Sequence, residues 1–176
     1  MHIFLTGDIQ VGKSTLIRKA LHEVPGIRLG GFRTVTIADV PGAIGAVYIL
    51  SAAAAENESP GSDQRVGIRY GPGRGPECFP QVFDTRGVQL LRDAEQADLI
   101  LMDEIGWMES NAAAFRSRVS ELLDGTVPIL GVVRKMGNAP LQETIRNHPA
   151  VRIVTVDVEN RNSLAGPLAE WIRNSL

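Results

Sequence analysis

Near the start of the chain stands Gly7-Asp8-Ile9-Gln10-Val11-Gly12-Lys13-Ser14, which fits the pattern G-x-x-x-x-G-K-[ST]. The apolar run His2-Ile3-Phe4-Leu5 precedes it, and residues 15–21 have the composition of a helix. A strand, a glycine-containing loop and a helix in this order form a phosphate-binding loop, because the glycines let several backbone N–H groups point at one anion. The partial positive charge of the helix N-terminus adds to this attraction. The sequence therefore predicts a strand, a phosphate-binding loop and a helix over residues 2–21.

Individual roles follow from the pattern of this loop. Lys13 is expected to reach the β- and γ-phosphates as a point charge, and the Ser14 hydroxyl is expected to ligate Mg²⁺. The predicted nucleotide-binding residues of this segment are Gly7, Asp8, Ile9, Gln10, Val11, Gly12, Lys13, Ser14 and Thr15.

Length and composition restrict the class of protein. A chain of 176 residues with 44% hydrophobic and 22% charged residues is typical of one globular domain, expected over residues 1–176. A net charge of −2 gives no general attraction for nucleic acid. The single cysteine, Cys78, excludes an intramolecular disulfide and fits a reducing compartment. We expect a cytoplasmic protein without a signal peptide, and without an apolar run of the ~18 residues that a membrane span needs.

Strand and helix patterns alternate along the chain. Besides the first strand, strands are expected at residues 30–37, 43–50, 65–70, 81–84, 99–102, 127–133 and 151–156. Further helices are expected over residues 87–96, 111–123, 140–147 and 164–172. Alternating strands and helices predict a parallel, doubly wound α/β sheet. The segment 30–84, which contains the turn Asp39-Val40-Pro41-Gly42, is expected to add antiparallel strands beside it.

Two adjacent acidic residues, Asp103 and Glu104, follow the apolar run 99–102. Open α/β sheets bind ligands at the carboxyl ends of their strands, so both side chains are expected near the phosphates. Asp103 is expected to bind Mg²⁺ opposite Ser14, directly or through water, and Glu104 to orient or deprotonate an attacking water. A pair that merely faces solvent is the alternative. No N-K-x-D sequence occurs, so a dedicated guanine specificity is not expected.

Several segments in the same order resemble the nucleoside-triphosphatase family THEP1 over nearly the whole chain. They are residues 4–7, 11–16 and 31–34, the motif Asp103-Glu104-Ile105-Gly106 with Met108-Glu109, and residues 159–162. The resemblance implies a P-loop, RecA-like fold of three αβα layers, in which added antiparallel strands extend a mostly parallel central sheet. It also implies a small cytosolic enzyme that uses Mg²⁺ to hydrolyse ATP, GTP and other nucleoside triphosphates, CTP and UTP among them, to the diphosphate and phosphate. We expect it to be a monomer.

The chain departs from the family pattern at two places. The family usually has small residues where Asp8-Ile9-Gln10 stands, and lysine where Trp107 stands. Asp8 places a negative charge beside the phosphate site, which weakens nucleotide binding unless the side chain turns outward. Trp107 could stack on a base or lie against the core.

Other residues have two interpretations each. Arg33, on a strand expected beside the first strand, could supply a cation to the γ-phosphate or be a surface arginine. Asn160 and Arg161 follow the last predicted strand and could contact the base or simply begin a helix. Arg65, Arg69, Arg74 and Arg86 could form a phosphate-contacting lid or solubilise a Gly- and Pro-rich segment.

Three functions remain open at this point. Hydrolysis of nucleoside triphosphates is the prediction, because an adjacent Asp-Glu pair favours water activation. A nucleoside or nucleotide kinase would instead need an acceptor pocket. A nucleotide-binding switch with little turnover is the third function, and it would bind nucleotide without releasing phosphate.

Overall fold

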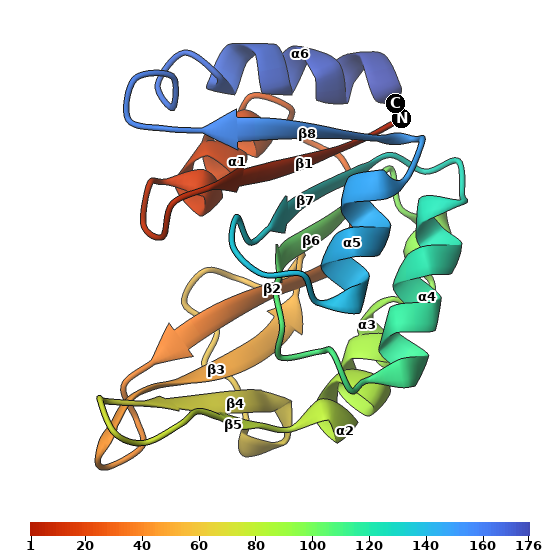
Figure 1. Ribbon diagram of the computed structural model, residues 1–176. Helices are drawn as coiled ribbons and strands as arrows, with labels where there is room; N and C mark the ends of the chain where they lie inside the picture. Colours follow the sequence, from red (N-terminus) through yellow and green to blue (C-terminus); the bar gives the residue numbers. More distant parts are fainter.

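The computed structural model describes all 176 residues, which form one eight-stranded sheet with helices packed on it (Figure 1). None of the helices combines the length and apolar character needed to cross a membrane. The elements in chain order are β1 (His2–Gly7), α1 (Lys13–His22), β2 (Leu29–Ile37), β3 (Ala43–Ser51), η1 (Ser62–Gln64), β4 (Arg65–Tyr70), β5 (Glu77–Cys78), α2 (Pro80–Val82), η2 (Phe83–Gly87), α3 (Val88–Leu90), η3 (Ala94–Gln96), β6 (Leu99–Ile105), α4 (Ala113–Leu123), β7 (Ile129–Val133), α5 (Pro140–Asn147), β8 (Val151–Val156) and α6 (Ala165–Ser175).

The parallel part of the sheet runs in the order β2-β6-β7-β1-β8. Strand β6 has apolar side chains on both faces: Leu99 and Leu101 pack with α1 and α6, whereas Ile100 and Met102 pack with α4 and α5. Figure 1 shows α4 and α5 together on one side of the sheet. The predicted doubly wound α/β fold is therefore confirmed, since a strand without a polar face has to be covered on both sides.

Strands β3, β4 and β5 extend the sheet beyond β2 in antiparallel pairing. A turn at Pro41-Gly42 joins β2 to β3, and Gly42 adopts φ 78° there, a conformation that glycine tolerates readily. The prediction of antiparallel strands within residues 30–84 is thus confirmed.

The order of the strands corrects one expectation. Strand β2 lies beside β6, and both β6 and β7 separate it from β1. Arg33 is therefore not on a neighbour of the first strand, and it lies within β2, opposite Asp103 in the β2–β6 register. Periodicity within a strand carries no information about its neighbours, and strands that follow one another in the chain often do not pair.

The prediction of a strand at residues 81–84 is wrong. Pro80 begins a short helical turn there, and the chain continues as a π-helical turn through Phe83–Gly87. Phe83, Gly87 and Leu91 are all buried, a spacing of four residues that helical backbone places on one face. A short apolar run does not by itself distinguish strand from helix. The single helix expected over residues 87–96 is likewise wrong, because the π-helical turn ends at Gly87, Val88–Leu90 is α-helical, and a turn at 91–93 separates these residues from the 3₁₀ turn Ala94–Gln96.

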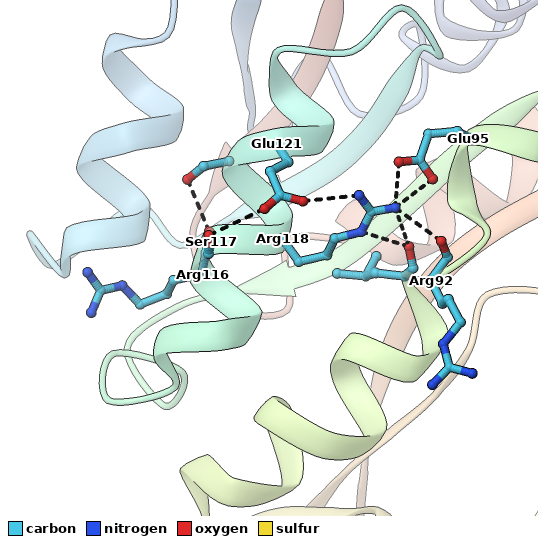
Figure 2. Close-up of polar contacts among 8 residues, drawn as sticks. Arg92, Glu95, Arg116, Ser117, Arg118 and Glu121 are labelled. Atoms are coloured by element: carbon cyan, nitrogen blue, oxygen red, sulfur yellow. Dashed lines mark hydrogen bonds and ion pairs between the residues drawn. The ribbon is translucent and has the colours of Figure 1, made fainter.

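Arg118 of α4 joins that helix to the segment before β6, as Figure 2 shows. Its Nη2 donates to the carbonyl oxygens of Leu91 (2.9 Å) and Arg92 (3.2 Å), which lie at the end of α3. The same guanidinium forms ion pairs with Glu95 and Glu121. The Arg118 side chain is only 18% exposed, so its donors depend on these protein acceptors in place of water.

Replacing Arg118 by methionine is expected to lower the free energy of unfolding by ~1–3 kcal/mol, because the Leu91 and Arg92 carbonyl groups lose their donor. Unfolding in urea measures the change. Arg92→Met is the matched control, since the Arg92 side chain is exposed and only its backbone carbonyl takes part in the network. Equal stability of the two variants would contradict this assignment.

Candidate active site

The predicted phosphate-binding loop joins β1 to α1. Gly7 adopts φ 151°, and a Cβ atom there would lie 2.3 Å from the Val156 carbonyl oxygen, so only glycine fits. Lys13 is 8% exposed, and its Nζ donates to the carbonyl oxygens of Gly7 (3.0 Å) and Asp8 (2.8 Å). The loop's own backbone therefore holds the lysine ammonium over the place where phosphate is expected.

Asp8, the next residue of the loop, is paired with Lys135. Its Oδ1 accepts a hydrogen bond from Lys135 Nζ at 2.8 Å, and both side chains are largely exposed. The hydrogen bond and charge of Lys135 lower the pKa of the Asp8 carboxyl group. The negative charge that departs from the family pattern is thus paired with a lysine at the surface.

Asp103 lies near the carboxyl end of β6, which extends three residues further than the sequence predicted. The carboxyl group is buried, and burial raises its pKa from 3.8 to about 6, opposed by contact with the Ser14 hydroxyl and by the charges of Lys13 and Arg33. The nearby charge of Glu104 acts in the same direction as burial. Asp103 has no ion-pair partner in the structure, so its charge is unusually costly in the unliganded protein.

Glu104 follows Asp103 and is about one-third exposed. Its Oε1 lies 3.1 Å from Arg134 Nε, which fixes the direction of the carboxylate. Because Glu104 sits at the edge of an open cavity, its carboxylate is accessible to water from that side.

An open cavity of about 450 Å³ brings the predicted residues together at the carboxyl ends of the strands. The P-loop side of its wall is formed by Ile9, Gln10, Gly12, Lys13, Ser14 and Thr15. The opposite side is formed by Thr34, Thr36, Arg69, Asp103, Glu104 and Arg134. Among the other predicted loop residues, Gly7 and Asp8 line an adjoining cavity, and Val11 is buried beneath the loop.

Glu109 and Trp107 lie beside this cavity. Glu109 Oε1 accepts a hydrogen bond from the Gly106 N–H at 2.7 Å, and burial raises the pKa of its carboxyl group to about 7. The bond closes the turn that follows β6, which gives Glu109 a structural role. Trp107 lines a smaller cavity of about 90 Å³ that shares Glu104 and Arg134 with the larger one.

The three remaining predicted site residues lie outside the main cavity. Arg33 donates to the Ala55 carbonyl oxygen at 2.8 Å. The side chain of Asn160 folds back on its own turn, where it bonds the Thr155 carbonyl oxygen and the Asp157 amide. Arg161 contacts the P-loop, because its Nη1 donates to the Val11 carbonyl oxygen at 3.2 Å. Their contacts with nucleotide stay predictions.

Sequence reasoning missed Arg134 and Lys135, which follow β7 and reach Glu104 and Asp8. The signal was available, since both residues come directly after an apolar strand, as Asp103 and Glu104 do. The rule that ligands meet the carboxyl ends of parallel strands covers both pairs equally.

The family model described as NTPase matches residues 2–169 of the chain. The chain belongs to this nucleoside-triphosphatase family. The match covers the P-loop, the Asp103-Glu104 pair and the segment after β8, and it confirms the resemblance found in the sequence.

Individual members of the nucleoside-triphosphatase family are similar over almost their full length. "Nucleoside-triphosphatase THEP1" of Methanosarcina barkeri is 30% identical, with 98% of each chain covered. The human "Cancer-related nucleoside-triphosphatase" is 32% identical, with 99% of this chain and 97% of the human protein covered. Among solved structures, THEP1 from Aquifex aeolicus superposes with a TM-score of 0.76 at 22% identity, covering 98% of this chain and 99% of that one, and it supports the fold alone.

Asp103→Asn is expected to stabilise the protein without metal or nucleotide at pH 8, by on the order of 2 kcal/mol, because the folded state no longer buries an unpaired carboxylate. Between pH about 6 and pH 3.8, folded wild type binds more protons than unfolded wild type. The gain should therefore shrink as the pH falls through that range. Urea unfolding in the presence of a chelator measures the stability difference between variant and wild type at pH 8 and at pH 4. A variant less stable than wild type at pH 8 would show that the buried carboxylate does not destabilise the folded protein.

Proposed function

We propose that this chain hydrolyses nucleoside 5′-triphosphates to the diphosphate and inorganic phosphate in a Mg²⁺-dependent reaction. The observation that carries the proposal is the meeting of Lys13, Ser14, Asp103 and Glu104 at one cavity. The names of its relatives, which are nucleoside-triphosphatases, support the same reaction.

The P-loop would bind the β- and γ-phosphates through its backbone N–H groups and Lys13. The ammonium group of Lys13 has three N–H donors, and the Gly7 and Asp8 carbonyl oxygens accept two of them. One donor remains for a phosphate oxygen. The lysine is thus oriented before the nucleotide arrives, so little side-chain entropy is lost on binding.

Asp103 and Ser14 fit a divalent cation. A buried carboxylate without an ion-pair partner, beside a hydroxyl group, gains most from a hard cation with oxygen ligands. No cluster of three or more His, Cys, Asp or Glu side chains is present, which matches Mg²⁺ held by few protein ligands and by the phosphates. When bound there, Mg²⁺ would neutralise charge on the β- and γ-phosphate oxygens.

Glu104 would accept a proton from the attacking water. The water oxygen forms a bond to the γ-phosphorus, and the bond from that phosphorus to the β–γ bridging oxygen breaks. The diphosphate leaves with the electron pair of that bond, and inorganic phosphate remains beside Glu104. The exposed side of the carboxylate faces the cavity, as this step requires.

A broad choice of base is part of the proposal, with ATP, GTP, CTP and UTP all as substrates. The wall of the main cavity contains no aromatic side chain, and no guanine-reading sequence is present. Without such groups, affinity depends on the phosphates, which the four nucleotides share. A monomer in the cytoplasm is also part of this proposal, in keeping with a chain whose single cysteine cannot form an intramolecular disulfide.

Wild-type protein is expected to release phosphate from all four nucleotides only when Mg²⁺ is present and without any added acceptor. Lys13→Ala should abolish release because it removes the phosphate-binding charge. Glu104→Gln should lower kcat by ~10²-fold or more, with nucleotide binding retained, because the amide cannot accept the proton. Phosphate release and equilibrium nucleotide binding measure the two effects.

Two results would redirect the proposal. Nucleotide consumption that requires an added hydroxyl-bearing acceptor would identify a kinase. Tight binding with no phosphate release under any condition would identify a nucleotide-binding switch.

A further inference from the structure

Arg134 occupies a fixed position between the two motifs of the site. It follows β7, which lies between β6 and β1 in the sheet. Its backbone N–H donates to the Ile105 carbonyl oxygen at 3.0 Å, and its own carbonyl oxygen accepts from Gln142 Nε2 and Arg146 Nη2. Hydrogen bonds to both peptide groups that flank its Cα atom therefore anchor the main chain from which the guanidinium extends.

The glycine after the Asp103-Glu104 pair leaves room for this side chain. A Cβ atom on Gly106 would lie 2.8 Å from Arg134 Cδ, closer than any real contact between such atoms. Gly106 does not adopt a positive φ, so its backbone conformation does not require glycine. A larger residue there would push the stem of Arg134 out of its position.

The guanidinium group has donors that the protein does not use. Nε is paired with Glu104, whereas neither Nη atom donates to a protein acceptor, and neither is buried. Arg134 also lines the main cavity together with Lys13 and Ser14. The other arginine of that wall, Arg69, differs because its Nη2 donates to Thr36 Oγ1 and its Nε is buried.

We propose that Arg134 binds the γ-phosphate through its Nη donors while Nε keeps the carboxylate of Glu104 in place. This inference rests on the proposed hydrolysis. A planar guanidinium can hold two anions along different edges, so one side chain would set the distance between the base and the phosphorus it serves. Its charge also offsets the repulsion between the phosphates and the two carboxylates of Asp103 and Glu104.

In this arrangement Arg134 is a catalytic residue, and it also distinguishes triphosphate from diphosphate. A diphosphate lacks the group that the Nη atoms bind, so Arg134 should favour triphosphate over diphosphate. As the bond to the bridging oxygen breaks, the γ-phosphoryl oxygens remain within reach of the same donors. A cation supplied to this group within the chain is worth ~10³-fold or more in kcat in other P-loop enzymes.

The test compares Arg134→Gln with Arg152→Gln, a change of the same kind at an exposed arginine of β8 that forms no ion pair. Arg134→Gln should lower kcat by ~10³-fold and reduce the preference for a non-hydrolysable triphosphate analogue over the diphosphate by at least ~10-fold. Its affinity for the diphosphate should stay close to that of wild type, which also shows that the protein is folded. Arg152→Gln should leave all three values unchanged.

Two further variants separate contact with phosphate from a purely structural role. Added guanidinium chloride should restore part of the activity of Arg134→Ala, whereas added ammonium chloride at the same concentration should not. Gly106→Ala retains the guanidinium but displaces it, so its kcat should also fall.

An unchanged preference for triphosphate in Arg134→Gln would overturn the proposal, whatever happens to kcat. Absence of hydrolysis by wild type would overturn the proposed function instead, and the binding preference would still decide whether Arg134 contacts the γ-phosphate.

Discussion

Close contact between Phe4 and Gly131 fixes the arrangement on which the site depends. The two residues face each other in the parallel register of β1 and β7, and a Cβ atom at position 131 would lie 2.2 Å from the Phe4 ring. Phe4 is fully buried, so sliding β1 against β7 would force its ring into larger neighbouring side chains. Three residues after Phe4 stands Gly7, the first residue of the P-loop. Three residues after Gly131 stands Arg134, which forms the ion pair with Glu104. The contact between Phe4 and Gly131 thus sets the position of the P-loop relative to Arg134 along the strand direction.

At the end of β6, the Asp103 carboxyl group is buried although its charged form would be more stable in water. The apolar residues that precede Asp103 are buried on both faces of the sheet, and β6 continues past Asp103 to Ile105. The Asp103 carboxyl group is therefore largely shielded from water. The same burial that raises its pKa strengthens its attraction for a cation, because the competing solvent is excluded. Lys13 does not neutralise this carboxylate, since its ammonium bonds loop carbonyl oxygens. The free protein therefore keeps a charge imbalance that a metal and a triphosphate together would relieve.

Much of the fold could be predicted from the sequence, because its signals are local. The glycines of the P-loop, the apolar run 99–102 and the Pro41-Gly42 turn each determine nearby backbone without reference to distant residues. The order of the strands could not be predicted in this way, since it depends on which apolar faces meet in the folded chain. The strand prediction within residues 80–91 was wrong for a related reason. Packing against Phe115 favours helix over strand there, and the contact between Phe83 and Phe115 joins residues more than 30 positions apart in the sequence. Arg134 belongs to no motif, and although its place directly after an apolar strand suggests the site, its pairing with Glu104 is known only from the folded structure.

Helix α4 and the segment before β6 are joined at two points in the first half of the helix. Asp84 Oδ1 accepts the Phe115 N–H at 3.0 Å near the start of α4, and Arg118 binds the carbonyl groups at the end of α3 one turn later. Gly87 lets the Phe115 ring approach between these two links. Neither piece can detach without leaving polar groups of the other unpaired. Residues 80–96 and α4 are therefore expected to unfold locally as one cooperative unit, with their peptide hydrogens exchanging through the same opening event.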